Sequence, residues 1–186
     1  MTFNIDWDFI RKLEGFELRG YVPVDRDTNN RVQSGVTIGA GFDIGQQTRK
    51  SIQDLFLPPV LTGRLLRYVG LKGEQARLAL RAQPLVLSEK EAELLSQKVK
   101  QKYANQIEKE YNSVSKVPFK SLNKGQQTVI ASVGFQYGSL ARRTPNFFRV
   151  ITSQDWKRAY KHLLSFGDAY KNRRKQEAEY LRKYLV

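Results

Sequence analysis

The sequence predicts a mostly helical α+β protein with one small sheet near its N-terminus. From about residue 49 onward, apolar residues recur at three- and four-residue steps, which is the period of a helix with one buried face. Over residues 34–45, apolar residues instead alternate with glycine and small polar residues, which is the period of a strand. The long helical part and the short alternating part together define the fold class.

The chain is long enough for one domain with a substantial core. Its 186 residues contain no repeat, no low-complexity tract and no long linker. We therefore expect a single domain over residues 1–186, made of two lobes. A β lobe is expected at about residues 17–47, and a helical lobe at about 49–186 that also takes in a helix at about 5–15.

The first elements follow from local signals. Apolar residues three positions apart from Trp7 to Leu13 predict a short helix, and Gly15 is its stop signal. Tyr21–Val24 is expected to be extended, because a residue that precedes proline avoids the helical region. Asp25–Asn30 is rich in aspartate and asparagine and predicts a turn.

Capping residues predict where the later helices begin. Ser88 and Glu91 form the pattern of a capping box, and the apolar periodicity behind them predicts the longest helix. Further helix starts are predicted at Asn123 with Gln126, at Thr144 with Pro145 and at Ser153, with a last helix at about residues 168–184.

The alternating segment Ser34–Gly45 has two unlike faces if it forms one strand. One face carries Val36, Ile38, Ala40, Phe42 and Ile44, and the other carries Gly35, Thr37, Gly39, Gly41, Asp43 and Gly45. Glycine contributes no packing to a strand, so glycines confined to one face indicate that something approaches the backbone closely there. We interpret this face as the floor of a binding cleft.

Composition limits the function classes. The chain has 32 Lys and Arg against 18 Asp and Glu, so its net charge of +14 favours an anionic partner such as nucleic acid, lipid headgroups or the bacterial cell wall. It has no cysteine and a single histidine, His162, which argues against thiol chemistry, a Ser-His-Asp triad and a multi-histidine metal site. We expect no metal and no cofactor. No apolar run approaches the roughly 20 residues of a membrane span.

Two carboxylates and a hydroxyl flank the expected cleft. Glu14 ends the first helix, while Thr37 and Asp43 lie on the glycine-rich face. Glycoside hydrolysis uses such a pair, in which one carboxyl group donates a proton and the other stays ionised to activate water. Apolar neighbours suit Glu14 to the acid role, and backbone N–H groups around Asp43 suit it to the ionised role. Taken alone, Glu14 is more typical of a solvated helix end and Asp43 of a turn than of catalysis, and it is their order on either side of the sheet that favours catalysis.

The same residues carry a resemblance to a known family. Leu13–Phe16 (LEGF) and Gly35–Gln46 (GVTIGAGFDIGQ) resemble the phage-type lysozyme superfamily, and most of all the muramidase domain of the bacteriocin pesticin. Weaker similarity continues over Ala82–Ser88, Glu91–Ser96, Ser132–Gly138 and Asp168–Gln176, so the resemblance covers essentially the whole chain.

The resemblance implies a lysozyme-like fold with a cleft between a small β lobe and a helical lobe. It implies hydrolysis of the β-1,4 bond between N-acetylmuramic acid and N-acetylglucosamine in peptidoglycan. Glu14 then matches the general acid, Asp43 the water-activating carboxylate and Thr37 the neighbouring threonine. In another branch the second carboxylate precedes the threonine, so Asp25 or Asp27 is an alternative; we favour Asp43 because it shares a strand face with Thr37. The resemblance favours inversion at the anomeric carbon, which the sequence alone leaves open.

Several other residues are candidates for binding sugar or cell wall. Tyr21 suits stacking on a sugar ring, although packing in the hairpin explains it equally well. Gly39 and Gly41 would leave room for the ring, and Gln136 would line the sugar site. Arg174, with its basic neighbours, would contact the anionic wall, unless it lies on a solvated helix face.

The expected partner is bacterial peptidoglycan, and we expect a monomer. The first residues lack the basic start and apolar run of a signal peptide, so we expect synthesis in the cytoplasm and action at the wall or periplasm after release or delivery. A holin or a secretion machine would then be required, and an immunity protein is a further expected partner. Pesticin's import and receptor-binding regions have no counterpart in this length of chain.

Two alternative functions remain open at the level of sequence. A basic nucleic-acid-binding helical module would explain the charge, but Lys and Arg are spread through every predicted helix rather than gathered on one face. An inactive, wall-binding relative of lysozyme would keep the fold and lose the chemistry.

Overall fold

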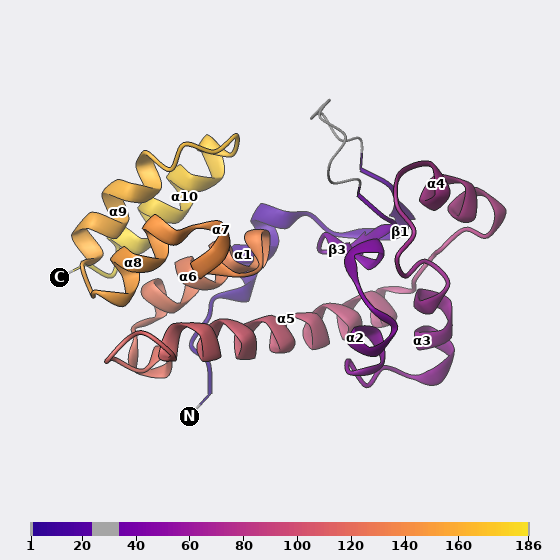
Figure 1. Cartoon of the computed structure of the whole chain (residues 1–186), viewed down its shortest axis with the longest axis horizontal. Coiled ribbons are helices and arrows are strands. Elements are labelled where there is room, and N and C mark those ends of the chain that lie inside the picture. The colour runs from indigo at the N-terminus through magenta and orange to yellow at the C-terminus, as the bar shows by residue number, and fades with distance from the viewer. Residues whose placement is uncertain (1, 24–33, 186) are drawn as a thin grey trace. The chain divides into compact units, whose positions relative to one another are not determined.

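The computed structural model describes residues 2–23 and 34–185. The chain divides into two compact units. One, which we call the sheet unit, spans Glu14–Gln101, and the other, the helical unit, combines Met1–Leu13 with Lys102–Val186 (Figure 1). The β lobe predicted at about 17–47 therefore lies inside a unit that also contains helices, and the prediction of a single domain stays a prediction.

The sheet has three short antiparallel strands in the order β1-β2-β3, namely β1 (Glu17–Tyr21), β2 (Thr37–Gly39) and β3 (Phe42–Asp43). Tyr21 pairs with Thr37 across the first two strands, and Thr37 pairs with Asp43 across the second two. A one-turn 3-10 helix, η1 (Ile44–Gln46), follows β3 directly.

The prediction of one long strand over residues 34–45 is wrong, because the chain reverses in the middle of it. Residues 40 and 41 form a turn that connects β2 to β3. Gly39 and Gly41 have φ angles of +62° and +81°, a left-handed backbone that residues with a Cβ rarely adopt. These two glycines are therefore required by a hairpin turn and do not form the floor of an extended strand.

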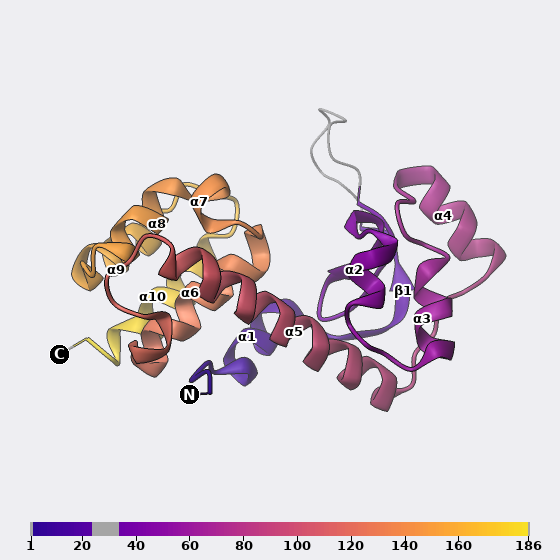
Figure 2. The same cartoon turned by 60° about the horizontal axis from the view of Figure 1, so that its bottom comes forward.

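The apolar side of this segment is buried, as predicted. Val36, Ile38 and Ile44 have no exposed surface. They belong to a unit that also contains α2 (Arg49–Gln53), α3 (Pro59–Leu66), α4 (Gly73–Ala82) and the first half of α5 (Glu89–Asn112) (Figure 2). The hairpin thus has one face anchored in a core, and the face that carries Thr37 and Asp43 is held in a defined position.

The helical unit contains most of α1 (Trp7–Glu14), the second half of α5, and a run of helices that follows the short η2 (Phe119–Ser121). That run consists of α6 (Lys124–Tyr137), α7 (Leu140–Arg143), α8 (Pro145–Thr152), α9 (Trp156–Leu164) and α10 (Lys171–Arg182). Its core gathers aromatic and branched side chains, including the fully buried Tyr111, Phe119 and Ile130. The mostly helical α+β class is therefore confirmed.

Two of the predicted capping boxes are confirmed. The backbone N–H of Ser88 donates to the Glu91 carboxylate at 2.8 Å, and the Asn123 side chain accepts from the backbone N–H of Gln126 at 2.9 Å. Both helices begin one residue after the predicted cap, at Glu89 and Lys124.

Two predicted helix starts are wrong in detail. The Thr144 hydroxyl donates to the Leu140 carbonyl oxygen at 3.0 Å and does not cap α8, which nevertheless begins at Pro145. Asp155, and not Ser153, caps α9 by accepting from the backbone N–H of Arg158. No helix within residues 2–23 and 34–185 is long and apolar enough to cross a membrane.

Candidate active site

One row of side chains crosses the sheet and contains both residues predicted on the glycine-rich segment. Tyr21, Thr37 and Asp43 are consecutive cross-strand partners on β1, β2 and β3. Directly opposite residues of antiparallel strands present their side chains on the same face of the sheet. Thr37 and Asp43 therefore share a face, but as partners across a hairpin and not as neighbours along one strand.

Asp43 is held by backbone N–H groups, and burial acts against its charge. The backbone N–H of Gly35 donates to both carboxylate oxygens at 3.2 Å. Burial raises the pKa of Asp43 above 3.8, against the lowering effect of hydrogen bonds from Gly35, Gly45 and Gln46 and of the Lys72 charge. The predicted N–H donors are present, but desolvation outweighs them. The carboxylate is thus a stronger base than an exposed aspartate.

The glycines of this segment indicated that something approaches the backbone closely. In the structure, the neighbouring group is the backbone of the same chain. A Cβ at Gly35 would lie 2.4 Å from Cα of Gly45, and one at Gly45 would lie 2.3 Å from the carbonyl oxygen of Leu71. Real side chains cannot tolerate such distances, so these two positions require glycine. The packing of Gly35 against Gly45 brings the N–H donor of Gly35 to the Asp43 carboxylate.

The turn of the hairpin contacts the other candidate carboxylate. Glu14 is the last residue of α1, and Gly15, with a φ of +73°, ends the helix. A Cβ at Gly41 would lie 3.6 Å from Oε2 of Glu14, whereas a Cβ at Gly39 would meet no atom within 4 Å. Oε1 of Glu14 is shielded from solvent. Glu14 and the β2–β3 turn are therefore neighbours within the sheet unit.

Tyr21 lies within electrostatic reach of both candidate carboxylates. Burial raises the pKa of the Tyr21 phenol, and the negative charges of Glu17, Asp43 and Glu14 raise that pKa further. The phenol is therefore protonated at neutral pH and is able to donate a hydrogen bond. The ring is 40% exposed, which leaves part of its surface open to a ligand.

Thr37 supports the loop before β2. Its side chain is 4% exposed, and its hydroxyl donates to the carbonyl oxygen of Gly35 at 3.3 Å. The proton of this hydroxyl is therefore engaged by the backbone. The hydroxyl oxygen keeps lone pairs that can accept a hydrogen bond. Asp25 and Asp27, the alternative second carboxylates, lie outside the described residues.

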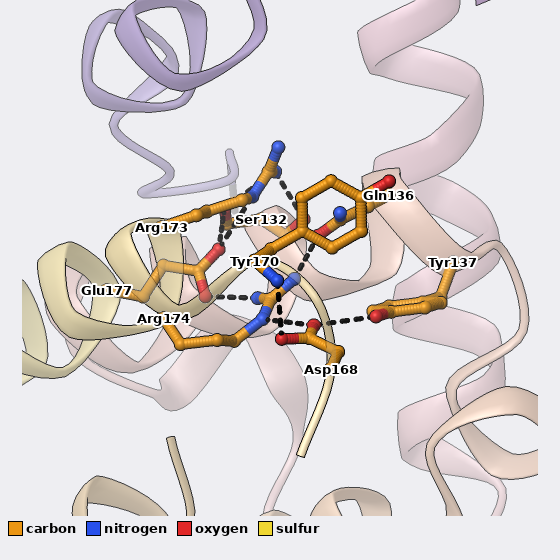
Figure 3. A network of polar contacts seen from close by, with 8 residues as sticks. All are labelled: Ser132, Gln136, Tyr137, Asp168, Tyr170, Arg173, Arg174 and Glu177. Carbon is orange, nitrogen blue, oxygen red and sulfur yellow. Dashed lines mark hydrogen bonds and ion pairs between the residues drawn. The ribbon is translucent and has the colours of Figure 1, made fainter. Parts of the chain in front are cut away.

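Arg174 is buried, which does not fit the predicted contact with the anionic wall. It is 2% exposed and lies on α10 in the helical unit. Its Nε donates to Asp168 at 2.9 Å, and its two terminal nitrogens donate to Glu177 and to Gln136 (Figure 3). Gln136, predicted to line a sugar site, thus accepts from Arg174.

Arg173 completes the same network from the next position of α10. Its Nε donates to Glu177 at 3.1 Å, and Nη2 donates to the carbonyl oxygen of Ser132 at 3.0 Å (Figure 3). The Ser132 hydroxyl donates to the same Glu177 carboxylate at 2.5 Å. Glu177 has no exposed surface, and its three partners compensate the cost of burying its charge. The network therefore joins α6 to α10.

Tyr137 extends the network to the loop before α10. Its hydroxyl donates to Asp168 at 2.6 Å. Burial, followed by this hydrogen bond, raises the pKa of Tyr137 to about 12. The Arg174 guanidinium lies 4.7 Å from the centre of the Phe166 ring, so aromatic rings also surround its charge. Tyr137 therefore belongs to the packing of this unit.

Comparison with known proteins gives the chain a family. Residues 4–157 match the model of the Pesticin family, which is described as the C-terminal part of a bacterial toxin homologue of phage lysozyme. The chain belongs to the Pesticin family. No curated protein sequence matches it.

The Pesticin match includes all of the candidate chemistry and only part of the buried network. Glu14, Thr37, Asp43 and Gln136 fall within residues 4–157, whereas Arg174 lies beyond them. A mostly helical protein with a three-stranded antiparallel sheet near the N-terminus is consistent with the phage lysozyme-like fold of this family. Among the described residues, no group of three or more His, Asp or Glu side chains could hold a metal ion.

The sequence interpretation of this Pesticin-family chain missed the role of Glu177. Glu177 follows Arg173 by four residues and Arg174 by three, which is the spacing of side chains on one helix face. That spacing is equally typical of exposed helix surfaces, so it does not indicate burial by itself. One signal in the sequence could have indicated this burial. The small, polar Ser132 interrupts a strongly apolar stretch of α6, which leaves room there for a buried charged side chain such as Glu177.

Proposed function

We propose that this protein is a muramidase that hydrolyses the β-1,4 bond between N-acetylmuramic acid and N-acetylglucosamine in bacterial peptidoglycan. The observation that carries the proposal is the Pesticin family match over residues 4–157, which makes the chain a homologue of phage lysozyme. Glu14 and Asp43 both lie within electrostatic reach of Tyr21 in the sheet unit, which supports a two-carboxylate mechanism.

Glu14 is the proposed general acid, which protonates the oxygen of the leaving sugar. Its carboxyl group is partly withdrawn from solvent, with Oε1 shielded and Oε2 beside the backbone of Gly41. The glycine at position 41 allows the backbone, without a side chain, to face Oε2.

Asp43 is the proposed base, which removes a proton from the attacking water. Hydrogen bonds from Gly35 fix both of its oxygens, so the carboxylate is oriented before substrate arrives. Its raised pKa makes it a stronger proton acceptor, provided that the pH stays above that pKa. Thr37 is its direct cross-strand partner, and we assign its hydroxyl oxygen the role of accepting a hydrogen bond from that water.

Tyr21 is the proposed sugar contact of this site. The phenol is protonated at neutral pH and the ring is 40% exposed, so it can donate a hydrogen bond to a sugar hydroxyl and stack on the ring. The net charge of +14 would attract the enzyme to the anionic wall. Action at the bacterial wall or periplasm, with a holin, a secretion machine or an immunity protein as a partner, belongs to the same proposal.

Clearance of a peptidoglycan suspension or of permeabilised Gram-negative cells tests the proposal. Glu14→Gln and Asp43→Asn should each reduce the rate by about a hundredfold or more, the usual contribution of an acid or base group. Circular dichroism should show that both variants keep the fold. Full activity in Asp43→Asn, together with loss in Asp25→Asn, would transfer the base role to Asp25. If the wild-type protein clears neither suspension, the result would favour the alternative of an inactive, wall-binding relative of lysozyme.

A further inference from the structure

Helices α8 and α9 pack against each other in the helical unit (Figure 2). Side chains of both helices line a polar pocket. Its volume is about 350 Å³. It is lined by the α8 side chains Asn146, Arg149 and Val150, by Ser153 after that helix, and by the α9 side chains Arg158 and His162. No residue of the proposed muramidase site belongs to it.

The pocket concentrates positive charge without a compensating carboxylate. Arg149 and Arg158 are both exposed, and neither forms an ion pair with any carboxylate in the described parts of the chain. The lining contains no acidic residue. Nη2 of Arg149 donates to Oδ1 of Asn146 at 2.6 Å, which holds the guanidinium at the pocket and leaves its other N–H groups available.

His162 is the remaining titratable side chain of the pocket. Its Nδ1 is buried and has no hydrogen-bond partner among residues 2–23 and 34–185. Burial lowers the pKa of His162 against the raising effect of a backbone hydrogen bond, and the nearby Arg158 charge lowers it further, so the imidazole is neutral at neutral pH. Its ring packs edge-on against Phe166, with ring centres 5.4 Å apart.

We propose that this pocket binds a phosphate group, between the guanidinium groups of Arg149 and Arg158 and beside the His162 imidazole. Guanidinium groups bind phosphate oxygens through paired N–H donors, and two unpaired ones facing one pocket suit a group with more than one negative charge. The Asn146 amide nitrogen offers a further donor at the same wall, whereas the Ser153 hydroxyl donates to the carbonyl oxygen of Val150 at 2.9 Å.

An adjoining pocket provides space for whatever carries the phosphate. It measures about 240 Å³, shares Asn146 and His162 with the first pocket, and adds the rings of Tyr137, Phe147 and Phe166. Rings beside an anion site suit an organic group attached to the phosphate. The ligand class is therefore an organic phosphate, either a small soluble molecule or a lipid headgroup.

The single histidine of the chain makes the test direct. The only imidazole signals in an NMR spectrum of the full-length protein belong to His162. Titration with inorganic phosphate at neutral pH should shift these signals saturably, and sodium chloride at matched ionic strength should not. Arg158→Gln should weaken phosphate binding by about tenfold or more, as expected for loss of a charge-assisted hydrogen bond.

Two matched variants separate a built site from general attraction to a basic protein. Lys157→Gln removes the same charge one residue away, from an exposed side chain that does not line the pocket, and should leave phosphate binding unchanged. Asn146→Asp keeps the acceptor for Arg149 and adds a carboxylate, and should abolish binding. Equal weakening by Lys157→Gln and Arg158→Gln, or an equal shift with chloride, would overturn the proposal.

The source of the phosphate is distinguished by two further probes. Glycerol 3-phosphate that binds more tightly than inorganic phosphate would indicate a small soluble ligand that also uses the adjoining pocket. Sedimentation with phosphatidylglycerol vesicles that is lost in Arg158→Gln and kept in Lys157→Gln would indicate a lipid headgroup. None of these readouts depends on cleavage of peptidoglycan, so failure here and failure of the proposed muramidase are separate results.

Discussion

At the scale of single residues, Asp43 carries opposing influences on one carboxyl group. Backbone N–H groups favour the ionised form, and burial disfavours it more strongly, so the pKa is raised. An aspartate with a raised pKa is less stable as an anion in the folded protein than in the unfolded chain. Its ionisation therefore costs folding free energy, as is common where a site is built for chemistry.

The first prediction follows from the sign of this shift. Unfolded Asp43 ionises near 3.8 and folded Asp43 ionises at a higher pH, so stability falls as the pH rises through that interval. Asp43→Asn cannot ionise and escapes this loss. We expect its melting temperature, relative to wild type, to be higher at about pH 7 than at about pH 3. A difference that stays constant, or that favours wild type more at neutral pH, would contradict the shift.

The second prediction concerns the buried Arg174. Removal of its side chain leaves Glu177, which has no exposed surface, without its closest cationic partner. Arg174→Ala should lower the free energy of unfolding by about 3–5 kcal/mol, measured by denaturant titration. Lys175→Ala is the matched control, because Lys175 is exposed and its loss should change stability by about 0.5 kcal/mol or less. Equal stability of the two variants would exclude a buried, paired Arg174.

The residue scale also shows where sequence reasoning reaches its limit. Glu14 and Asp43 stand out in the sequence because a helix stop and a glycine-rich segment surround them. Arg174 does not, because the burial of a helical arginine depends on partners such as Gln136 and Asp168, which lie far away in the chain or in a loop. Nothing in the local pattern distinguishes it from the exposed Lys175 beside it.

At the scale of elements, the β2–β3 hairpin explains why the sequence placed Thr37 and Asp43 on one face correctly although it predicted one long strand. Its register pairs Thr37 with Asp43 and Ile38 with Phe42, so each pair joins residues of the same parity. The alternation of polar and apolar positions therefore continues through the turn without a break. Periodicity alone cannot separate such a hairpin from one long strand, although the glycines at 39 and 41 are typical turn residues.

The third prediction tests the role of this turn. Gly41→Val places a branched side chain beside Oε2 of Glu14 and should abolish peptidoglycan cleavage. Gly39→Val suffers a similar left-handed strain, of the order of 1–2 kcal/mol, but its Cβ meets nothing within 4 Å. We expect both variants to lose similar stability in thermal melts and only Gly41→Val to lose activity per folded molecule. Equal activity per folded molecule in the two variants would contradict the claim that Gly41 lies at the active site.

Helix boundaries were predictable where capping was reciprocal. The Ser88–Glu91 and Asn123–Gln126 pairs each satisfy backbone donors in both directions, and the helices begin where they predict. Thr144 was a weaker signal, because a threonine hydroxyl can also bond back to a carbonyl four residues earlier, as it does to Leu140. The uncapped helix still begins at Pro145, for which proline geometry is sufficient.

At the scale of the whole molecule, the two compact units carry different kinds of chemistry. The candidate carboxylates belong to the sheet unit, and the buried arginine network and the proposed phosphate pocket belong to the helical unit. The sequence predicted the fold class and family, since periodicity and motifs are local properties. It did not predict that the sheet unit extends to Gln101, because that boundary falls inside the continuous helix α5.

The chemistry of the reducing ends released from purified peptidoglycan tests the central claim most directly. Digested material, reduced with borohydride and analysed by mass spectrometry, should carry new N-acetylmuramic acid ends with the wild-type protein. Glu14→Gln at the same concentration should release about a hundredfold fewer. New N-acetylglucosamine ends, or undiminished release by Glu14→Gln, would contradict a muramidase that uses Glu14 as its acid.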